Sequence, residues 1–175
     1  MRLPMIVRAA EQEARAAALR AGGPLRLVWF GRLDALSGVA DLLPMAQLLR
    51  MRGVPFRLEI FGAGPLGGRI ADGIAGLGLG AQVSLVPPGP FDPVLVPHLR
   101  RNADLFLAPW RLATPQSAYV DALGCGLPIL GYRNRMWRRL QGLSGAGWAV
   151  GRRPDALARA VARLHGDREA VIAAS

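Results

Sequence analysis

The sequence contains no lysine, only one cysteine and few aromatic residues. A Walker-type phosphate loop requires a lysine, so this nucleotide-binding motif is excluded. With Cys125 alone, no intramolecular disulfide can form, which is compatible with a reducing compartment. No apolar run is long enough to span a membrane, and Glu11, Gln12, Glu13 and Arg15 interrupt the place where a secretory signal would have its apolar core. We therefore expect a cytoplasmic chain without a transmembrane segment.

Residues that could hold a metal ion are also scarce. The sequence has two histidines and neither an H-E-x-x-H nor a C-x-x-C motif. His98 and His165 both fall in segments with a helical pattern, where a solvated histidine is the usual case. We predict no metal site and no bound cofactor.

Basic residues outnumber acidic ones by 22 to 12, which gives a net charge of +10 and could indicate nucleic acid or an anionic membrane as a partner. The arginines are scattered, however, and the densest places are only the pairs Arg138-Arg139 and Arg152-Arg153. An arginine-only composition rich in alanine and glycine is also what a GC-rich genome would impose. We predict a solvated basic surface and no nucleic-acid partner.

The length of 175 residues and a hydrophobic fraction of 51% suit one domain with a substantial core. Short apolar runs alternate with segments of helical spacing. The expected strands are 25–30, 56–61, 83–86, 105–108, 128–132 and, more weakly, 148–150. The expected helices are 39–52, 65–77, 92–102, 116–124, 133–141 and 155–164.

The first part of the chain differs from this pattern. Residues 5–20 are rich in alanine and predict a helix, which Gly22, Gly23 and Pro24 would close. We therefore divide the chain into a lead-in helix and linker over 1–23 and a domain over 24–175.

Strands that are apolar throughout are buried on both faces, and strict alternation of strands with helices requires crossovers above and below a parallel sheet. The predicted fold is an α/β, Rossmann-like, doubly wound parallel sheet with about six strands. Such sheets bind ligands at the carboxyl ends of their strands, so the loops that follow the strands are the candidate sites.

The loop after the first strand combines Gly31, Arg32 and Ser37 just before a helix. A glycine turn, a guanidinium and free N–H groups at a helix start together favour an anion site. On this loop alone, an exposed arginine with Ser37 or Gly38 simply capping the helix is an equal alternative.

The second strand is followed by a match to the G-x-G-x-x-G dinucleotide fingerprint, which includes Gly62 and Gly64. This makes an NAD(P)-dependent oxidoreductase a rival interpretation. It ranks last because the motif follows the second strand, and because strand 83–86 ends in prolines without an acidic residue for the ribose. A loose turn into a glycine-rich helix explains the same glycines.

The fourth loop leads into a helix that is predicted to start near Gln116 and to direct its N–H groups toward the ligand edge. Asp121 lies more than one turn into this helix, so a role as ligand acceptor fits it better than a cap. Its carboxylate could bind a diol such as a ribose.

Five motifs occur here in the order found in one enzyme family: Gly31-Arg32-Leu33, Phe61 to Pro65, Leu77-Gly78-Leu79, Ala103 to Leu107 and Asp121 to Pro128. Over residues 24–169 the chain resembles the C-terminal, donor-binding domain of GT-B-fold, family 4-type glycosyltransferases (glycosyl transferases group 1). The resemblance implies a nucleoside diphosphate sugar as donor, with Arg32 at the diphosphate, Asp121 at the ribose and no required metal. It also implies that the backbone near Val86 and Pro87 meets the base and that residues of the fourth loop cradle phosphate and sugar. These residues are Thr114, Pro115, Gln116 and Ser117.

Three departures from the family pattern bear on activity. Ser37 stands where the family usually has a lysine at the phosphates, Ala113 or Thr114 stands where an acid usually meets the sugar, and Asp121 replaces a glutamate. Loss of the lysine removes positive charge from the place where the leaving group becomes negative. The candidates to replace this cation are Arg111, Arg133 and Arg135.

The leading hypothesis is a retaining glycosyltransferase that transfers a sugar to an unknown acceptor and is incomplete without a separate acceptor-binding domain or subunit. The alternative is a non-catalytic module that binds a nucleotide sugar but has lost turnover. The missing lysine and the missing acid favour that alternative.

Overall fold

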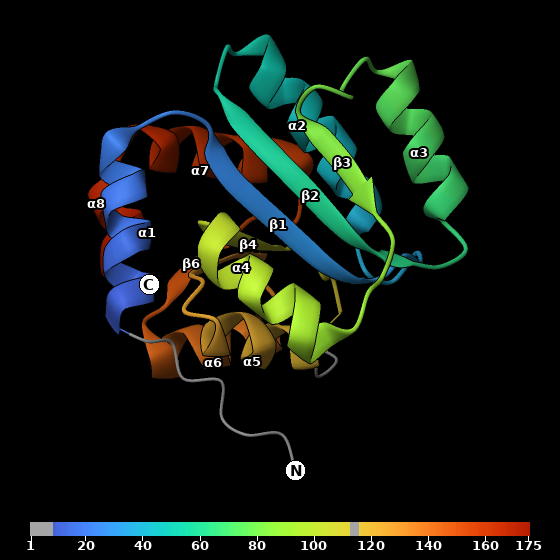
Figure 1. Cartoon of the computed structure of the whole chain (residues 1–175). Helices are drawn as coiled ribbons and strands as arrows, with labels where there is room; N and C mark the ends of the chain where they lie inside the picture. Colours follow the sequence, from blue (N-terminus) through green and yellow to red (C-terminus); the bar gives the residue numbers. More distant parts are fainter. Residues whose placement is uncertain (1–8, 113–115) are drawn as a thin grey trace.

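The computed structural model describes residues 9–112 and 116–175. Six strands form one entirely parallel sheet in the order β3-β2-β1-β4-β5-β6 (Figure 1). This confirms the predicted doubly wound α/β fold and its strand number. The strands are β1 (Leu25–Arg32), β2 (Phe56–Ala63), β3 (Val83–Val86), β4 (Leu105–Ala108), β5 (Ile129–Tyr132) and β6 (Gly147–Val150).

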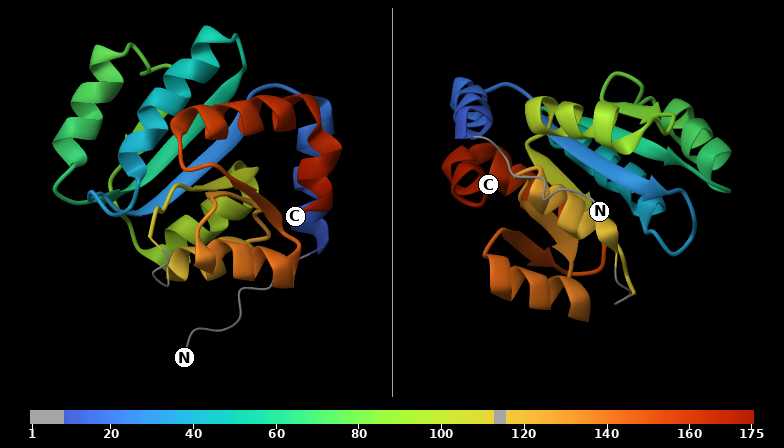
Figure 2. Two further views of the ribbon diagram at one scale, coloured as in Figure 1. Left: turned by 180° about the vertical axis from the view of Figure 1, so that it is seen from behind. Right: turned by 60° about the horizontal axis from the view of Figure 1, so that its bottom comes forward.

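Helices cover both faces of the sheet, as the apolar strands require (Figure 2). On one face, α2 and α7 pack on alternate strand residues such as Leu27, Leu58 and Leu130. On the other face, α4 and α5 pack on Val28 and Phe106. The helices of the domain are α2 (Leu42–Met51), α3 (Gly67–Gly76), α4 (Val96–Asn102), α5 (Ser117–Gly124), α6 (Arg135–Ser144), α7 (Pro154–Gly166) and α8 (Arg168–Ala173).

The order of the strands reverses between β1 and β4. The chain runs outward from β1 through β2 to β3, returns to β4 on the other side of β1, and then runs outward to β6. The loops after β1 and β4 therefore diverge from neighbouring strands, which is where doubly wound sheets bind their ligands.

A buried ion pair ties β1 to β4 at the opposite end of the sheet. Asp104 is 2% exposed and accepts hydrogen bonds from the backbone N–H of Arg26 at 2.8 Å and from its guanidinium at 2.6 Å. The Asp104 of the Ala103 to Leu107 motif thus has a structural role far from the ligand edge.

Helix α1 (Ala9–Ala21) packs beside α8 and α4 rather than standing apart (Figure 1). Leu19 is buried in the same core as β1 and α7. Arg15 is 3% exposed and donates to the backbone oxygens of Arg100, Cys125 and Gly126, so α1 is bound to the ends of α4 and α5. Residues 5–8 of the predicted first helix lie outside the described residues.

Most differences between predicted and observed elements are small shifts of their ends. The predicted helix 39–52 begins as a 3₁₀ turn at Val39–Asp41, and the predicted helix 92–102 begins as a π-helical turn at Phe91–Leu95. The weakly predicted last strand is present as β6, and α8 was not predicted as a helix. Asp167 caps α8 by accepting from the N–H of Ala170, and with six residues this helix is too short to show the apolar spacing on which the predictions relied.

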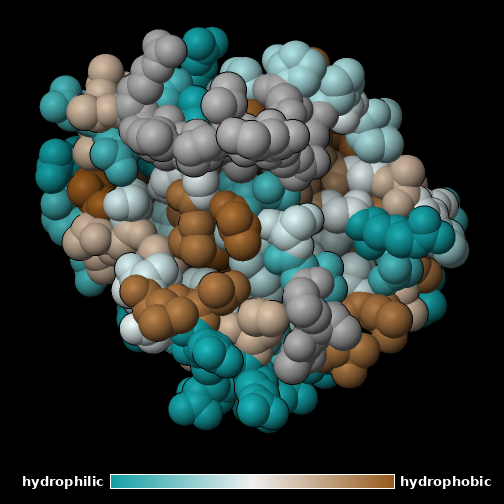
Figure 3. All heavy atoms as spheres, turned by 90° about the horizontal axis from the view of Figure 1, so that it is seen from below, coloured by the Kyte–Doolittle hydropathy of each residue, from teal (hydrophilic) through white to brown (hydrophobic). Residues whose placement is uncertain are grey.

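No helix within the described ranges has both the length and the apolar character needed to cross a membrane. On the face seen from below, apolar side chains lie in several groups between polar ones (Figure 3).

Candidate functional site

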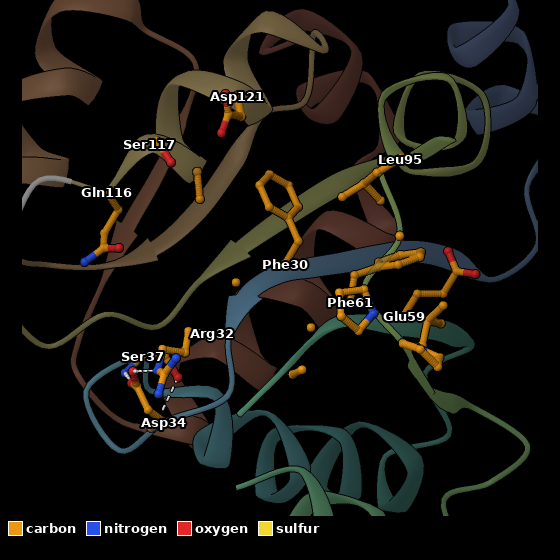
Figure 4. A pocket seen from close by; sticks show the side chains of 18 of the residues that line it. Phe30, Arg32, Asp34, Ser37, Glu59, Phe61, Leu95, Gln116, Ser117 and Asp121 are labelled. Atoms are coloured by element: carbon orange, nitrogen blue, oxygen red, sulfur yellow. Dashed lines mark hydrogen bonds and ion pairs between the residues drawn. The ribbon is translucent and has the colours of Figure 1, made fainter. Parts of the chain in front are cut away.

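A cavity of about 940 Å³ lies at the carboxyl ends of β1, β2 and β3 and beside the start of α5. In Figure 4, Arg32, Asp34 and Ser37 form one group at its edge, Glu59 and Phe61 lie on another side, and Gln116, Ser117 and Asp121 follow α5. The cavity is thus built where the order of the strands reverses. Of the predicted site residues, nine line it: Gly31, Arg32, Ser37, Gly62, Val86, Pro87, Gln116, Ser117 and Asp121.

Arg32 ends β1, and its side chain is 73% exposed. Its Nε lies 3.6 Å from Oδ2 of Asp34, a loose ion pair that leaves the guanidinium accessible from the cavity. Asp34 in turn accepts from the backbone N–H groups of Leu36 at 3.0 Å and Ser37 at 2.9 Å. The loop after β1 is therefore held by its own aspartate.

Ser37 is buried, and its hydroxyl is used within the same loop. Oγ donates to the carbonyl of Asp34 at 2.7 Å and accepts from the N–H of Val39 at 3.3 Å. This agrees with the capping alternative for Ser37, because the bond to Val39 satisfies a donor at the start of the 3₁₀ turn. The hydroxyl supplies no positive charge in place of a lysine.

Gly62 near the end of β2 and Gly64 just after it allow close contact between the ends of β1 and β2. A Cβ atom on Gly62 would lie 2.1 Å from the carbonyl oxygen of Gly31, and one on Gly64 would lie 2.5 Å from that of Leu33. Gly64 has a φ of +156° and does not line the cavity. Its observed role is to allow its own backbone to lie close to the backbone of Leu33.

Helix α5 begins directly at the cavity. Gln116 is its N-terminal cap position and Ser117 its first residue, while Asp121 is 8% exposed and faces the cavity from the second turn. Thr114 and Pro115, also predicted as donor-binding, lie outside the described residues.

A buried polar network fixes α5 to its neighbours. Asn134 donates through Nδ2 to the carbonyl of Trp110 at 2.9 Å and to the hydroxyl of Tyr119 at 3.1 Å, and its Oδ1 caps α6 at Trp137. The Tyr119 and Trp137 rings stack at 5.5 Å. Burial raises the pKa of Tyr119, so this hydroxyl stays neutral and serves as an acceptor within the network.

Three titratable residues that line the cavity were missed by the sequence analysis, namely Asp34, Glu59 and His98. Glu59 of β2 and His98 of α4 both line it, and their side chains form a pair at 2.6 Å. His98 had been interpreted as a solvated histidine. The available signal was Glu59, a carboxyl group between the apolar residues Leu58 and Ile60, which a fully buried strand would not contain without a partner.

Arg111, a candidate for the missing cation, is engaged elsewhere. It pairs with Asp41, and its guanidinium lies 5.5 Å above the ring of Tyr132. The Tyr132 hydroxyl also donates to Asp41 at 2.8 Å, and burial raises the pKa of this tyrosine. Arg111, Arg133 and Arg135 are all absent from the cavity lining that the structure describes.

The charges around the cavity are consequently unbalanced. Within the described lining, Arg32 is the only arginine, and it shares the cavity with the carboxyl groups of Asp34, Glu59 and Asp121. The described residues contain no group of three or more His, Cys, Asp or Glu side chains placed to hold a metal ion.

Comparison with known proteins gives a family match over most of the chain. The model of the family described as "Glycosyl transferases group 1" matches residues 24–167. No curated protein matches the chain significantly.

Solved structures share the fold at low sequence identity. The C-terminal domain of LpcC, a glycosyl transferase group 1 family protein from Francisella tularensis, superimposes with a TM-score of 0.75 and 13% identity, covering 98% of this chain and 90% of that one. HepE from Anabaena in complex with UDP-glucose superimposes with a TM-score of 0.71 and 17% identity, covering 97% of this chain and 47% of HepE. TarM from S. aureus, in a complex that includes UDP, superimposes with a TM-score of 0.73 and 14% identity, covering 87% of this chain and 30% of TarM. The present chain therefore spans less than half the length of HepE and TarM.

Proposed function

Since the family match over residues 24–167 places this chain among the group 1 glycosyl transferases, we propose that it is the donor-binding half of such an enzyme. Its ligand is a nucleoside diphosphate sugar, and transfer to the acceptor proceeds with retention of anomeric configuration. The observation that carries the proposal is the cavity at the strand reversal, which brings together predicted site residues from β1, β2, β3 and α5.

The diphosphate fits between Arg32 and the start of α5. The Arg32 guanidinium is exposed at the cavity edge, and the N–H groups at the beginning of α5 point toward the same space with the positive end of the helix dipole. Both groups stabilise negative charge, which increases on the diphosphate as the bond to the sugar breaks. No metal is required in this scheme.

The nucleoside lies on one side of this anion site, with its ribose at Asp121 and its base beyond the ribose. Asp121 faces the cavity from α5, and a carboxylate can accept both hydroxyls of a ribose. Val86 and Pro87 follow β3 and form part of the wall where the base would lie.

The acceptor would be held by a part that this chain does not provide. The chain spans 47% of HepE and 30% of TarM but 90% of the separate LpcC domain, so the proposed division into donor and acceptor halves has a structural parallel. A second domain or subunit placed over the cavity would complete the enzyme.

A non-catalytic nucleotide-sugar module is the second candidate, and the charges of the cavity favour it. Ser37 is engaged within its own loop, and three carboxyl groups face a single arginine among the described lining residues. Donor binding without transfer would follow if one cation stabilises the ground state but not the departing diphosphate. The NAD(P)-dependent alternative has less support, because Gly64 of the fingerprint lies outside the cavity lining.

Calorimetric titration with UDP, GDP, UDP-glucose, GDP-mannose and NAD tests these alternatives. We expect one nucleoside diphosphate and its sugar derivative to bind, and Arg32→Ala and Asp121→Ala each to weaken binding by about tenfold, as loss of a charged hydrogen bond implies. Arg139→Ala and Asp72→Ala are matched controls, since both residues are exposed and outside the cavity lining.

A folded chain that binds none of the nucleoside diphosphates would refute the proposal, and binding of NAD alone would favour the oxidoreductase. Hydrolysis of the bound donor by water, which yields free sugar and the nucleoside diphosphate, would favour the transferase over the non-catalytic module.

A further inference from the structure

Glu59 is a carboxyl group in a part of the cavity that is otherwise apolar or aromatic. It lies in β2 between the buried residues Leu58 and Ile60, and its side chain remains 33% exposed, toward the cavity. In Figure 4 it lies beside Phe61, well separated from the Arg32 group.

His98 and Asn102 of α4 hold this carboxyl group in place. Asn102 Nδ2 donates to His98 Nδ1 at 3.3 Å, and Nε2 then carries the hydrogen that His98 donates to Glu59 Oε2 at 2.6 Å. The imidazole also meets the Phe61 ring edge-on at 5.3 Å. Both nitrogens of His98 are therefore occupied, and the Glu59 carboxyl group makes no other hydrogen bond or ion pair with the residues that the structure describes.

The walls around Glu59 suit a flat heterocycle. Phe61 pairs with Val86 in the register of β2 and β3, so the aromatic ring and the end of β3 are adjacent. Val86, Pro87 and Leu95 also line the cavity. A planar ring can pack against these groups, and its edge must then offer hydrogen-bond donors, because a carboxylate only accepts. Oε1 of Glu59 and the second lone pair of Oε2 can each accept one of them.

We propose that Glu59, positioned by His98, selects guanine, so that the donor is a guanosine diphosphate sugar. This inference rests on the proposed function and adds the identity of the base. Guanine presents two adjacent donors, N1–H and the 2-amino group, on one edge. Uracil places its single N3–H between two carbonyl oxygens that a carboxylate repels, and adenine and cytosine place a ring acceptor beside their amino group.

The discriminating experiment compares GDP, IDP, UDP and ADP by calorimetry on the wild-type chain and on Glu59→Gln. IDP lacks only the 2-amino group of GDP. We expect GDP to bind about tenfold to a hundredfold more tightly than UDP or ADP, the range of discrimination that a two-donor contact supplies, with IDP between them.

In Glu59→Gln the amide presents one acceptor and one donor, which matches the mixed edge of uracil. We expect GDP to bind more weakly, UDP to bind more tightly and the difference between GDP and IDP to disappear. Glu13→Gln, an identical change at an exposed position of α1, should leave all four affinities unchanged. Circular dichroism and thermal unfolding check that both variants fold.

The two proposals fail in different ways. If no nucleoside diphosphate binds, the donor-binding function is refuted together with the choice of base. If UDP or ADP binds to the wild type at least as tightly as GDP, or if Glu59→Gln leaves the ratio of GDP to UDP affinity unchanged, only the role of Glu59 is refuted. The wild-type comparison decides this even if the variant does not fold.

Discussion

Arg15 shows how much one charged residue can contribute when it is buried. Its guanidinium donates to three backbone oxygens at the ends of α4 and α5, those of Arg100, Cys125 and Gly126. The last carbonyls of a helix lack partners within the helix and carry partial negative charge. A cation placed there satisfies both helix ends at once, and desolvation lowers the pKa of Arg15 without a change in this role.

We predict that Arg15→Met lowers the free energy of unfolding by about 3 kcal/mol, because methionine fills similar space but leaves these buried carbonyls unpaired. Urea denaturation of the two proteins measures the difference. Arg20→Met is the control in the same helix, since Arg20 is exposed and forms only a surface ion pair with Glu169. Equal effects of the two substitutions would contradict the assigned role of Arg15.

At the level of elements, the site depends on contact between the loops after β1 and β4. Gly38 has a φ of +71°, and a Cβ atom there would lie only 2.1 Å from the carbonyl oxygen of Pro109. The first loop follows Arg32, the last residue of β1, and the fourth leads into α5 with Asp121. This glycine therefore sets the separation between the two sides of the proposed ligand site.

The consequence is testable with a pair of glycine substitutions. Gly53 has a similar φ of +65°, but apart from its chain neighbours no described residue comes within 4 Å of the position a Cβ would take. Gly53→Ala should therefore cost only the left-handed backbone preference, about 1 kcal/mol. Gly38→Ala adds the clash with Pro109, and we expect it to cost about 3 kcal/mol and to weaken ligand binding as well.

Thermal unfolding measures the stability of each variant, and calorimetric titration measures its affinity for the ligand. If Gly38→Ala were no more harmful than Gly53→Ala, the close approach of the two loops would not be needed.

For the whole molecule, α1 raises the question of where the folding unit begins. The predicted domain starts at residue 24, as does the family match. Yet α1 buries Leu19 in the main core and, through Arg15, touches both α4, which carries His98, and α5, which carries Asp121.

We expect a chain of residues 24–175 to unfold about 10 °C or more below the full chain, because it loses these hydrogen bonds and exposes the surface that Leu19 covers. It should also bind the nucleotide more weakly, since α4 and α5 lose a common support. Differential scanning calorimetry with and without GDP measures both effects. Unchanged stability and affinity would make α1 the simple lead-in that the sequence suggests.

The sequence by itself determined the architecture and the edge at which the ligand is expected. Uninterrupted apolar runs such as Leu105–Ala108 must be buried on both faces, and their alternation with helical segments permits little other than a parallel sheet. Glycines at the ends of the strands, such as Gly31 and Gly62, are also visible in the sequence. They indicate a close approach of the backbone, since a side chain on Gly62 would meet the carbonyl oxygen of Gly31.

Only the tertiary structure decided which polar groups share the cavity and which are engaged elsewhere. Glu59 and His98 are 39 positions apart and meet because α4 packs over β2. Arg111 forms an ion pair with Asp41, 70 positions away. Such pairs depend on distances across the fold, and local spacing carries no information about them. The sequence could therefore indicate a nucleotide site but not its base. The inference that guanine binds there required the neighbours of Glu59 in the tertiary structure.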